Sequence, residues 1–216
     1  MVEQVIKIPR SLPSGEIVAI DVSEDVYMRD YAESFHEWVD GVITKMSPVT
    51  LKHDELSNYS RLLLESYFAL KPIGKVIGAP FVMRLKNVKA RREPDLQVIL
   101  NSNPGTLENT YMDGAADICI EVVSAGSVTT DYGEKLEEYE RGGVREYWLF
   151  DPMRETTTFY RRNEKGQFQA HQPGAQDVYS TPLLPDFKLH VPTLWQSELP
   201  SIIEVIKSVE AMLKDE

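Results

Sequence analysis

The fold class of this 216-residue chain is decided by the stretch Asp117-Ile118-Cys119-Ile120-Glu121-Val122-Val123. It is an almost uninterrupted apolar run, which is typical of a strand buried on both faces inside an α/β domain. One residue breaks the run, the carboxylate of Glu121. A carboxylate in a buried strand costs free energy unless it is paired, hydrogen-bonded or bound to a cation. Glu121 is therefore the first candidate for a functional residue.

A second acid stands at the head of the preceding apolar run. Asp95 follows Pro94 and precedes Leu96–Leu100. Two carboxylates on neighbouring strands repel each other, and a divalent cation between them removes that repulsion. Carboxylate oxygens suit Mg2+ or Mn2+. We expect Asp95 and Glu121 to hold such an ion. The alternative is that each acid caps a helix or pairs with an arginine.

Outward from these two strands, helical and extended patterns alternate along the chain. The order predicts one α/β domain over residues 23–216, with a mixed central sheet flanked by helices, after an extended arm over residues 1–22. A polar loop is expected over residues 86–93. Helices are expected over residues 23–35, 48–70, 130–142 and about 202–213, and strands over residues 37–39, 42–43, 75–79, 81–85, 96–100, 117–123, 145–150, 156–161 and 167–171.

The composition indicates where the protein is located and how it could bind a polyanion. The single cysteine, Cys119, lies in an apolar run, and no stretch reads as a signal peptide or a membrane span, so a cytoplasmic protein without membrane contact is expected. The net charge of −11 opposes binding of a polyanion by overall charge. Cations must then gather locally. We expect a phosphate-binding run just before Asp95, formed by Lys86, Lys89, Arg91 and Arg92. The alternative is that these residues belong to a solvated loop without a binding role.

The motifs around the two acids fall into a recognisable order. They are Glu37-Trp38-Val39-Asp40-Gly41, Met46-Ser47-Pro48, His53, Pro94-Asp95, Glu121-Val122-Val123-Ser124, Asp131 with Lys135 and Tyr139, and Gly143 through Asp151-Pro152. This series resembles the Uma-type restriction endonucleases of the PD-(D/E)XK nuclease superfamily, from about residue 25 to residue 195. The resemblance implies a restriction-endonuclease-like fold and a magnesium-dependent endonuclease, with DNA as the expected substrate.

The sequence departs from the orthodox motif at one position. That motif has a lysine two residues after the glutamate, where this chain has Val123. The resemblance places the lysine on the following helix, at Lys135. Asp131, Lys135 and Tyr139 are spaced by four, so they share one helix face. A surface ion pair between Asp131 and Lys135 is the alternative.

Roles for the remaining candidates follow from the resemblance. The metal ligands would be Asp95, Glu121 and the backbone carbonyl of Val122, and Lys135 would act on the nucleophile and the phosphoryl oxygens. Glu37 would lie on the helical flank as a further ligand through water. His53 would line the site, although a lone histidine at a buried boundary is also a common packing residue.

Two broader expectations complete the sequence-based account. A homodimer is expected, with either the terminal helix around Ile202, Ile206 and Val209 or the hairpin of Trp38 at the contact. A second function is a catalytically inactive, nuclease-like binding or assembly module. Val123 and the acidic charge favour that second function, whereas Asp95, Glu121 and Lys135 favour the nuclease.

Overall fold

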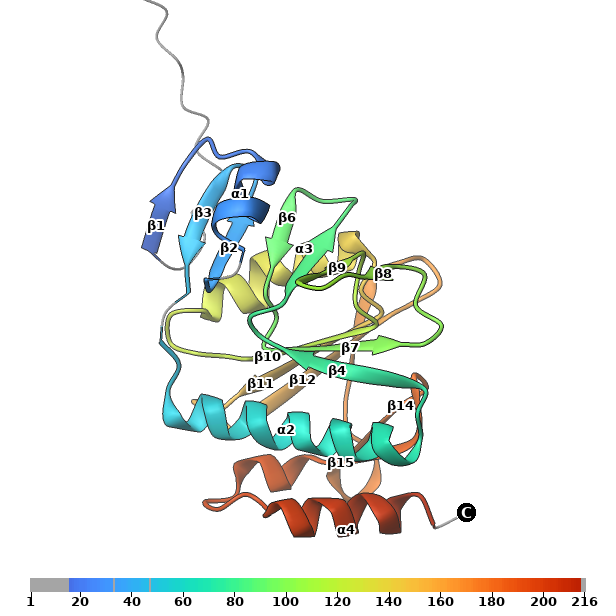
Figure 1. Ribbon diagram of the computed structural model, residues 1–216. Coiled ribbons are helices and arrows are strands. Elements are labelled where there is room, and N and C mark those ends of the chain that lie inside the picture. Colours follow the sequence, from blue (N-terminus) through green and yellow to red (C-terminus); the bar gives the residue numbers. More distant parts are fainter. Residues whose placement is uncertain (1–15, 33, 47, 215–216) are drawn as a thin grey trace, which may run out of the picture.

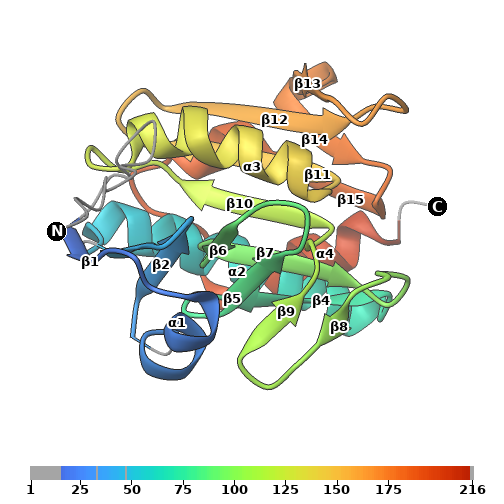
Figure 2. The ribbon, with the colours of Figure 1, turned by 90° about the horizontal axis from the view of Figure 1, so that it is seen from above.

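The core of the molecule is a mixed sheet of six strands in the order β13-β12-β11-β10-β7-β4. The structure is a computed structural model that describes residues 16–32, 34–46 and 48–214. In this sheet β10 and β11 are parallel, whereas the other neighbouring strands are antiparallel (Figures 1 and 2). The strands are β4 (Gly74–Gly78), β7 (Leu96–Leu100), β10 (Ile118–Val122), β11 (Glu146–Asp151), β12 (Thr156–Arg162) and β13 (Phe168–His171). The predicted mixed α/β architecture is confirmed.

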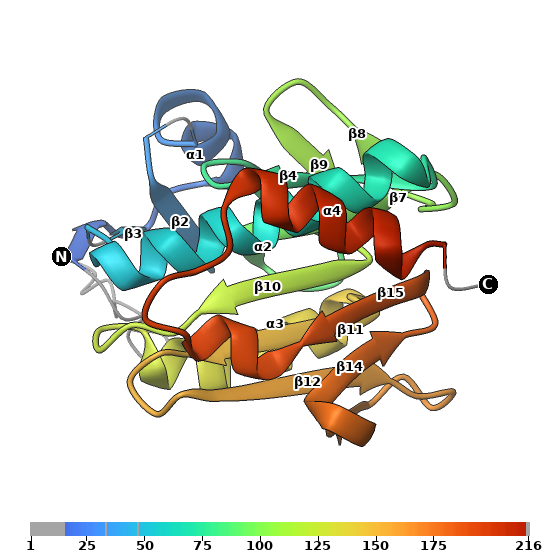
Figure 3. The same cartoon turned by 90° about the horizontal axis from the view of Figure 1, so that it is seen from below.

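The alternation of side chains along β7, β10 and β11 divides the core into two layers. Even-numbered residues such as Leu96, Ile120 and Trp148 contact α2 (Leu51–Leu70) and α4 (Ile202–Met212). Figure 3 shows these two helices together on one face of the sheet. Odd-numbered residues such as Cys119 and Leu149 face α3 (Lys135–Gly142) and a second sheet. Glu121 has the same parity, so its carboxylate points toward α3.

The second sheet has seven strands in the order β1-β3-β2-β6-β5-β9-β8 within the described part of the chain. The sequence predicted a single central sheet, and the structure differs from that prediction. Because β2 pairs with β6, these strands form a second, separate sheet. The strands are β1 (Glu16–Ala19), β2 (His36–Val39), β3 (Val42–Lys45), β5 (Val82–Leu85), β6 (Ala90–Arg92), β8 (Thr106–Leu107) and β9 (Tyr111–Asp113).

Several predicted boundaries were wrong, each for a local reason. The long helix begins at Leu51, because the side chain of Thr50 accepts the amide of His53 and caps it. The first helix, α1 (Glu24–Asp30), is capped by Ser23 at the predicted start but ends before Tyr31, short of the predicted residue 35. Residues 86–93 are not all loop, since β6 pairs with β2 and β5. In the predicted arm, β1 pairs with β3, and residues 1–15 lie outside the described part.

The segment after β10 enters its helix through a π-helical turn, η1 (Thr130–Glu134), which continues directly into α3. The hydroxyl of Tyr147 donates to the carbonyl of Asp131 in this widened turn, at 3.0 Å. Such turns are frequent at functional sites. The helix ends as predicted at Gly143, whose φ of 100° is readily available only to glycine.

The remaining elements close the far side of the molecule. They are η2 (Ala175–Asp177), β14 (Val178–Thr181), β15 (Leu184–His190) and η3 (Val191–Trp195). The hairpin β14-β15 brings Phe187 and Leu189 against the α2 face of the central sheet. Of the helices described, none combines the length and apolar character that crossing a membrane requires.

Candidate active site

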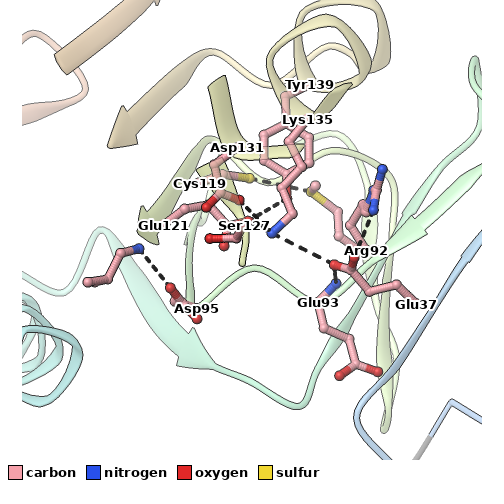
Figure 4. Close-up of polar contacts among 12 residues, drawn as sticks. Glu37, Arg92, Glu93, Asp95, Cys119, Glu121, Ser127, Asp131, Lys135 and Tyr139 are labelled. Atoms are coloured by element: carbon pink, nitrogen blue, oxygen red, sulfur yellow. Dashed lines mark hydrogen bonds and ion pairs between the residues drawn. The ribbon is translucent and has the colours of Figure 1, made fainter. Parts of the chain in front are cut away.

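The ammonium group of Lys135 lies among three buried carboxylates. Its Nζ is 2.9 Å from Oε1 of Glu121, 3.3 Å from Oδ1 of Asp131 and 3.9 Å from Oε1 of Glu37. Figure 4 shows the side chain reaching from the helix between Glu121 and Glu37. Burial lowers the pKa of Lys135, but Glu121, Asp131 and Glu37 together raise it well above its ordinary value. The lysine is therefore a fixed positive charge.

Glu121 is held from two sides on the α3 face of β10. The hydroxyl of Tyr139 donates to Oε1 at 2.7 Å, and Lys135 binds the same oxygen. Burial, opposed by Lys135 and reinforced by the nearby Asp95, raises the pKa of Glu121 above its ordinary value. The prediction that Asp131, Lys135 and Tyr139 share one helix face is confirmed, and a surface ion pair between Asp131 and Lys135 is excluded because all three side chains are buried.

Asp95 lies opposite Glu121 because β7 and β10 are antiparallel and Leu96 pairs with Ile120. Its Oδ2 accepts the backbone amide of Val122 at 2.7 Å and lies 3.0 Å from Nε2 of His53. Burial lowers the pKa of His53, but the hydrogen bond and charge of Asp95 raise it above its ordinary value. The structure thus brings His53 to the site as a partner of Asp95.

Glu37 lies on β2, not on a helical flank as predicted. Its Oε2 accepts from Nη1 of Arg92 at 2.7 Å, and its Oε1 accepts the amide of Glu93 at 3.2 Å. Burial raises the pKa of Glu37, but Lys135 and Arg92 outweigh this and lower it. Glu37 reaches the site because β6 pairs with β2 and brings Arg92 and the backbone amide of Glu93 to its carboxylate (Figure 4).

The predicted phosphate-binding run does not form one surface. Arg92 is fully buried against Glu37 and Glu138, and Arg91 is buried against Glu24. Lys86 and Lys89 are exposed, but they pair with Asp113 and Asp40 at 2.9 and 3.0 Å. The expectation was wrong for the arginines, because β6 is covered on both faces, so the consecutive side chains of Arg91 and Arg92 are both buried.

The acids and the lysine open onto one cleft of about 300 Å3. One wall is the entry to α2, from Met46 and Pro48 to His53, and the other is the turn after β10. Ser127 shapes that turn, since its hydroxyl accepts the amide of Ser124 at 2.9 Å. The ionisable groups that line the cleft are four carboxylates, Glu37, Asp95, Glu121 and Asp131, against the bases Lys135 and His53. The cleft therefore has a surplus of negative charge.

This donor set fits a magnesium-type ion. Mg2+ usually takes one or two protein carboxylates and completes its shell with water and substrate phosphate. Asp95 and Glu121 supply two hard oxygen donors in the same cleft. In residues 16–32, 34–46 and 48–214, no three His, Cys, Asp or Glu side chains gather into a ready-made metal cage.

The contacts of three residues in this region were missed by the sequence analysis. Tyr139 was placed on the helix face without a partner, and Arg92 was misassigned to the surface. Glu93 was not considered, although it is fully buried and neither of its carboxylate oxygens has a hydrogen-bond partner in the structure. Burial and the charge of Glu37 raise the pKa of Glu93 to about 8. Their position directly before Pro94-Asp95 was the available signal for Arg92 and Glu93.

Comparison with known proteins matches this site to a family. The family model Uma2, described as "Putative restriction endonuclease", matches residues 23–192, which include every residue of the cleft. The chain belongs to the Uma2 family. No curated protein is significantly similar to it in sequence.

A solved structure shares the fold of this Uma2 member. It is described as a "putative nuclease belonging to DUF820" from Anabaena variabilis ATCC 29413, and it is 18% identical in sequence. The match covers 74% of this chain and 89% of that one, with a TM-score of 0.61. The predicted restriction-endonuclease-like fold is therefore confirmed by the family match and by the likeness in fold to this putative nuclease.

Proposed function

We propose that this Uma2 protein is a magnesium-dependent endonuclease that hydrolyses phosphodiester bonds in DNA. One observation carries the proposal: Lys135, Glu121 and Asp95 meet in a single open cleft, with Nζ of the lysine 2.9 Å from Glu121. In the orthodox motif the lysine lies two residues after the glutamate on the same strand. Here a buried lysine on the following helix reaches that glutamate instead. The description of the family as restriction endonucleases supports DNA as the substrate.

The residues of the cleft divide the chemistry between them. Asp95 and Glu121, with the carbonyl of Val122, would hold Mg2+ or Mn2+, which when bound supplies an acidified water and polarises the scissile phosphate. Lys135 stays charged, so it can orient the attacking oxygen and stabilise negative charge on the phosphoryl oxygens. His53 holds Asp95 in place through Oδ2.

The surplus of negative charge in the cleft would attract a divalent cation, and the bound cation would allow an acidic protein to act on a polyanion. Four carboxylates repel phosphate until a divalent cation neutralises part of their charge. Substrate binding should therefore require metal. Of the predicted phosphate contacts, Lys86 and Lys89 keep exposed side chains at 61% and 78% and remain in the proposal as peripheral contacts.

A nicking assay tests the function. Supercoiled plasmid is incubated with the purified protein and with Mg2+, Mn2+ or EDTA, and Glu121→Gln serves as the matched control, since it keeps the shape of the side chain. We expect nicked and linear DNA only with wild type and metal. Metal-dependent DNA binding without cleavage would instead support the binding or assembly module. Cleavage that survives in Glu121→Gln would contradict the proposed site.

We further propose a homodimer through α4. Within the described residues, Val205 and Val209 of this helix are buried in the chain's own core, whereas Ile202, Ile203 and Ile206 are exposed at 62%, 65% and 42%. Three exposed isoleucines on one helix favour contact with another apolar surface. A second copy of the chain supplies one, and paired subunits would allow both DNA strands to be cut. The alternative contact, Trp38, is buried within the chain.

A further inference from the structure

Arg92 is a fully buried cation that contacts three elements of the site. Its Nη1 donates to Glu37 on β2 at 2.7 Å, and its Nε and Nη2 donate to the two oxygens of Glu138 on α3 at 2.7 and 3.0 Å. Nη2 also lies 3.5 Å from Glu134, one turn earlier. The planar guanidinium thus binds Glu37 from one edge, as Figure 4 shows, and Glu138 from another.

This arrangement links Arg92 to Lys135 through Glu37. The carboxylate of Glu37 has Arg92 on Oε2 at 2.7 Å and Lys135 near Oε1 at 3.9 Å. Lys135 lies a full ångström closer to Glu121, at 2.9 Å. Glu37 is satisfied chiefly by the arginine, and this leaves the lysine free to bind Glu121 and Asp131.

We propose that Arg92 is a positioning residue: it neutralises Glu37 and anchors α3, and thereby keeps the ammonium of Lys135 against Glu121. The proposal rests on the proposed function for its catalytic consequence, although the position of Lys135 can be tested without it. It assigns to Arg92 a role inside the site in place of the predicted contact with phosphate.

Removing the arginine has a defined physical effect. Without Arg92, the carboxylates of Glu37, Glu134 and Glu138 lose their shared cation, and the cation that remains beside Glu37 is Lys135. An uncompensated buried carboxylate attracts the nearest positive charge strongly in a low-dielectric interior. The ammonium should therefore move from Glu121 toward Glu37. Replacing Glu37 by glutamine removes that attraction and should return the lysine to Glu121.

A double-mutant cycle measures this coupling. The rate of plasmid nicking is compared for wild type, Arg92→Met, Glu37→Gln and the double variant. We expect Arg92→Met to lower kcat by about tenfold or more, with KM changed by less than about threefold, because the defect lies in the transition state rather than in substrate binding. In the Glu37→Gln background the same substitution should change kcat by less than about threefold.

Two further variants separate positioning from loss of the fold. Arg92→Lys keeps the charge but not the planar fork, and it should retain more activity than Arg92→Met. Arg161→Met is the control: Arg161 is partly buried and, like Arg92, pairs with a buried carboxylate, Glu146, but it lies on β12, outside the cleft. It should lose stability and keep kcat. Each rate is measured below the melting temperature of its variant.

A spectroscopic readout does not depend on cleavage. The 15N signal of the Lys135 side chain, assigned by its loss in Lys135→Met, should shift in Arg92→Met and move back toward the wild-type position in the double variant. An unchanged signal in Arg92→Met, or an equal loss of kcat in both Glu37 backgrounds, would overturn the positioning role. If wild type cleaves no DNA while the signal behaves as expected, the proposed function fails and the positioning role stands.

Discussion

Lys135 and Glu121 form a buried ion pair of 2.9 Å although they come from different elements, the helix α3 and the strand β10. The residue that occupies the orthodox lysine position, Val123, is instead packed in the hydrophobic layer beneath α3. Val123 has the same parity as Glu121, so its side chain lies on the same face. A lysine at position 123 would therefore compete with Lys135 for the space on that face. The positive charge therefore comes from the helix α3, and position 123 keeps an apolar side chain.

Lys135→Ala should lower the cleavage rate by about 100-fold or more while metal affinity stays within a few-fold, because the ammonium acts mainly on the transition state. Lys135→Arg should not restore full activity, since a rigid fork cannot replace a compact ammonium between three carboxylates. Breaking the buried pair should also cost about 3–5 kcal/mol of unfolding free energy. Single-turnover kinetics and denaturant titration measure both effects. An alanine variant with wild-type rates would remove Lys135 from the mechanism.

Asp95→Asn and Glu121→Gln should abolish cleavage and metal binding without unfolding the protein. Each substitution removes one charge from a cleft with more carboxylates than cations, so stability without metal should be unchanged or higher. In a thermal melt, Mg2+ or Mn2+ should raise the melting temperature of wild type but not of either variant. Glu65→Gln, on the exposed side of α2, is the control and should respond to metal as wild type does.

Tyr139→Phe should weaken the hold on Glu121. The substitution removes the hydroxyl that donates to Oε1 at 2.7 Å and keeps the edge-on ring contact with Tyr147. Loss of a buried hydrogen bond to a charged group should cost about 1.5–3 kcal/mol, measured by urea denaturation. The affinity for Mn2+ should rise or stay the same, because Glu121 has one competitor fewer. A fall in metal affinity without loss of stability would mean that the tyrosine organises the ligand rather than competing with it.

Ile203→Asp should convert a dimer into a monomer. A charge at this exposed position of α4 has no core contact to disturb, so the fold should be retained. Light scattering should give about twice 24.6 kDa for wild type and 24.6 kDa for the variant at micromolar concentration. Met153→Asp, at another exposed apolar residue, is the control. A wild-type mass of 24.6 kDa would exclude the dimer.

The loss of stability on acidification should depend in part on Glu24. Burial raises the pKa of Glu24, but Arg91 and Arg84 outweigh this and lower it below 4.5. A carboxyl group whose pKa is lower in the folded state stabilises the fold above the unfolded pKa, and this contribution is lost as pH falls through the folded pKa. Glu24→Gln should therefore destabilise the protein by about 1 kcal/mol at pH 7. The two proteins should converge in stability once the pH has fallen below the folded pKa of Glu24, which lies below its ordinary value. A difference that is constant with pH would show that the effect is not electrostatic.

The sequence by itself determined the two core strands, the helix that follows them and the residues that meet between them. The apolar runs around Asp95 and Glu121 are typical of buried strands, and the spacing of Asp131, Lys135 and Tyr139 predicts one helix face in any α/β arrangement. Turn chemistry was equally local: Asp40-Gly41 and Gly143 require φ values that few other residues accept, and both form the predicted turns. These features depend on neighbours within a few residues.

Only the tertiary structure decided which cations are exposed and which carboxylates share a lysine. The run before Asp95 looks polar in sequence, but pairing of β6 with β2 and β5 turns Arg91 and Arg92 inward. Glu37 enters the site through the same pairing, from a strand more than 50 residues before its partner Arg92. Such contacts depend on sheet register and on the free energy of pairing buried charges. Neither quantity is encoded in the spacing of residues along the chain.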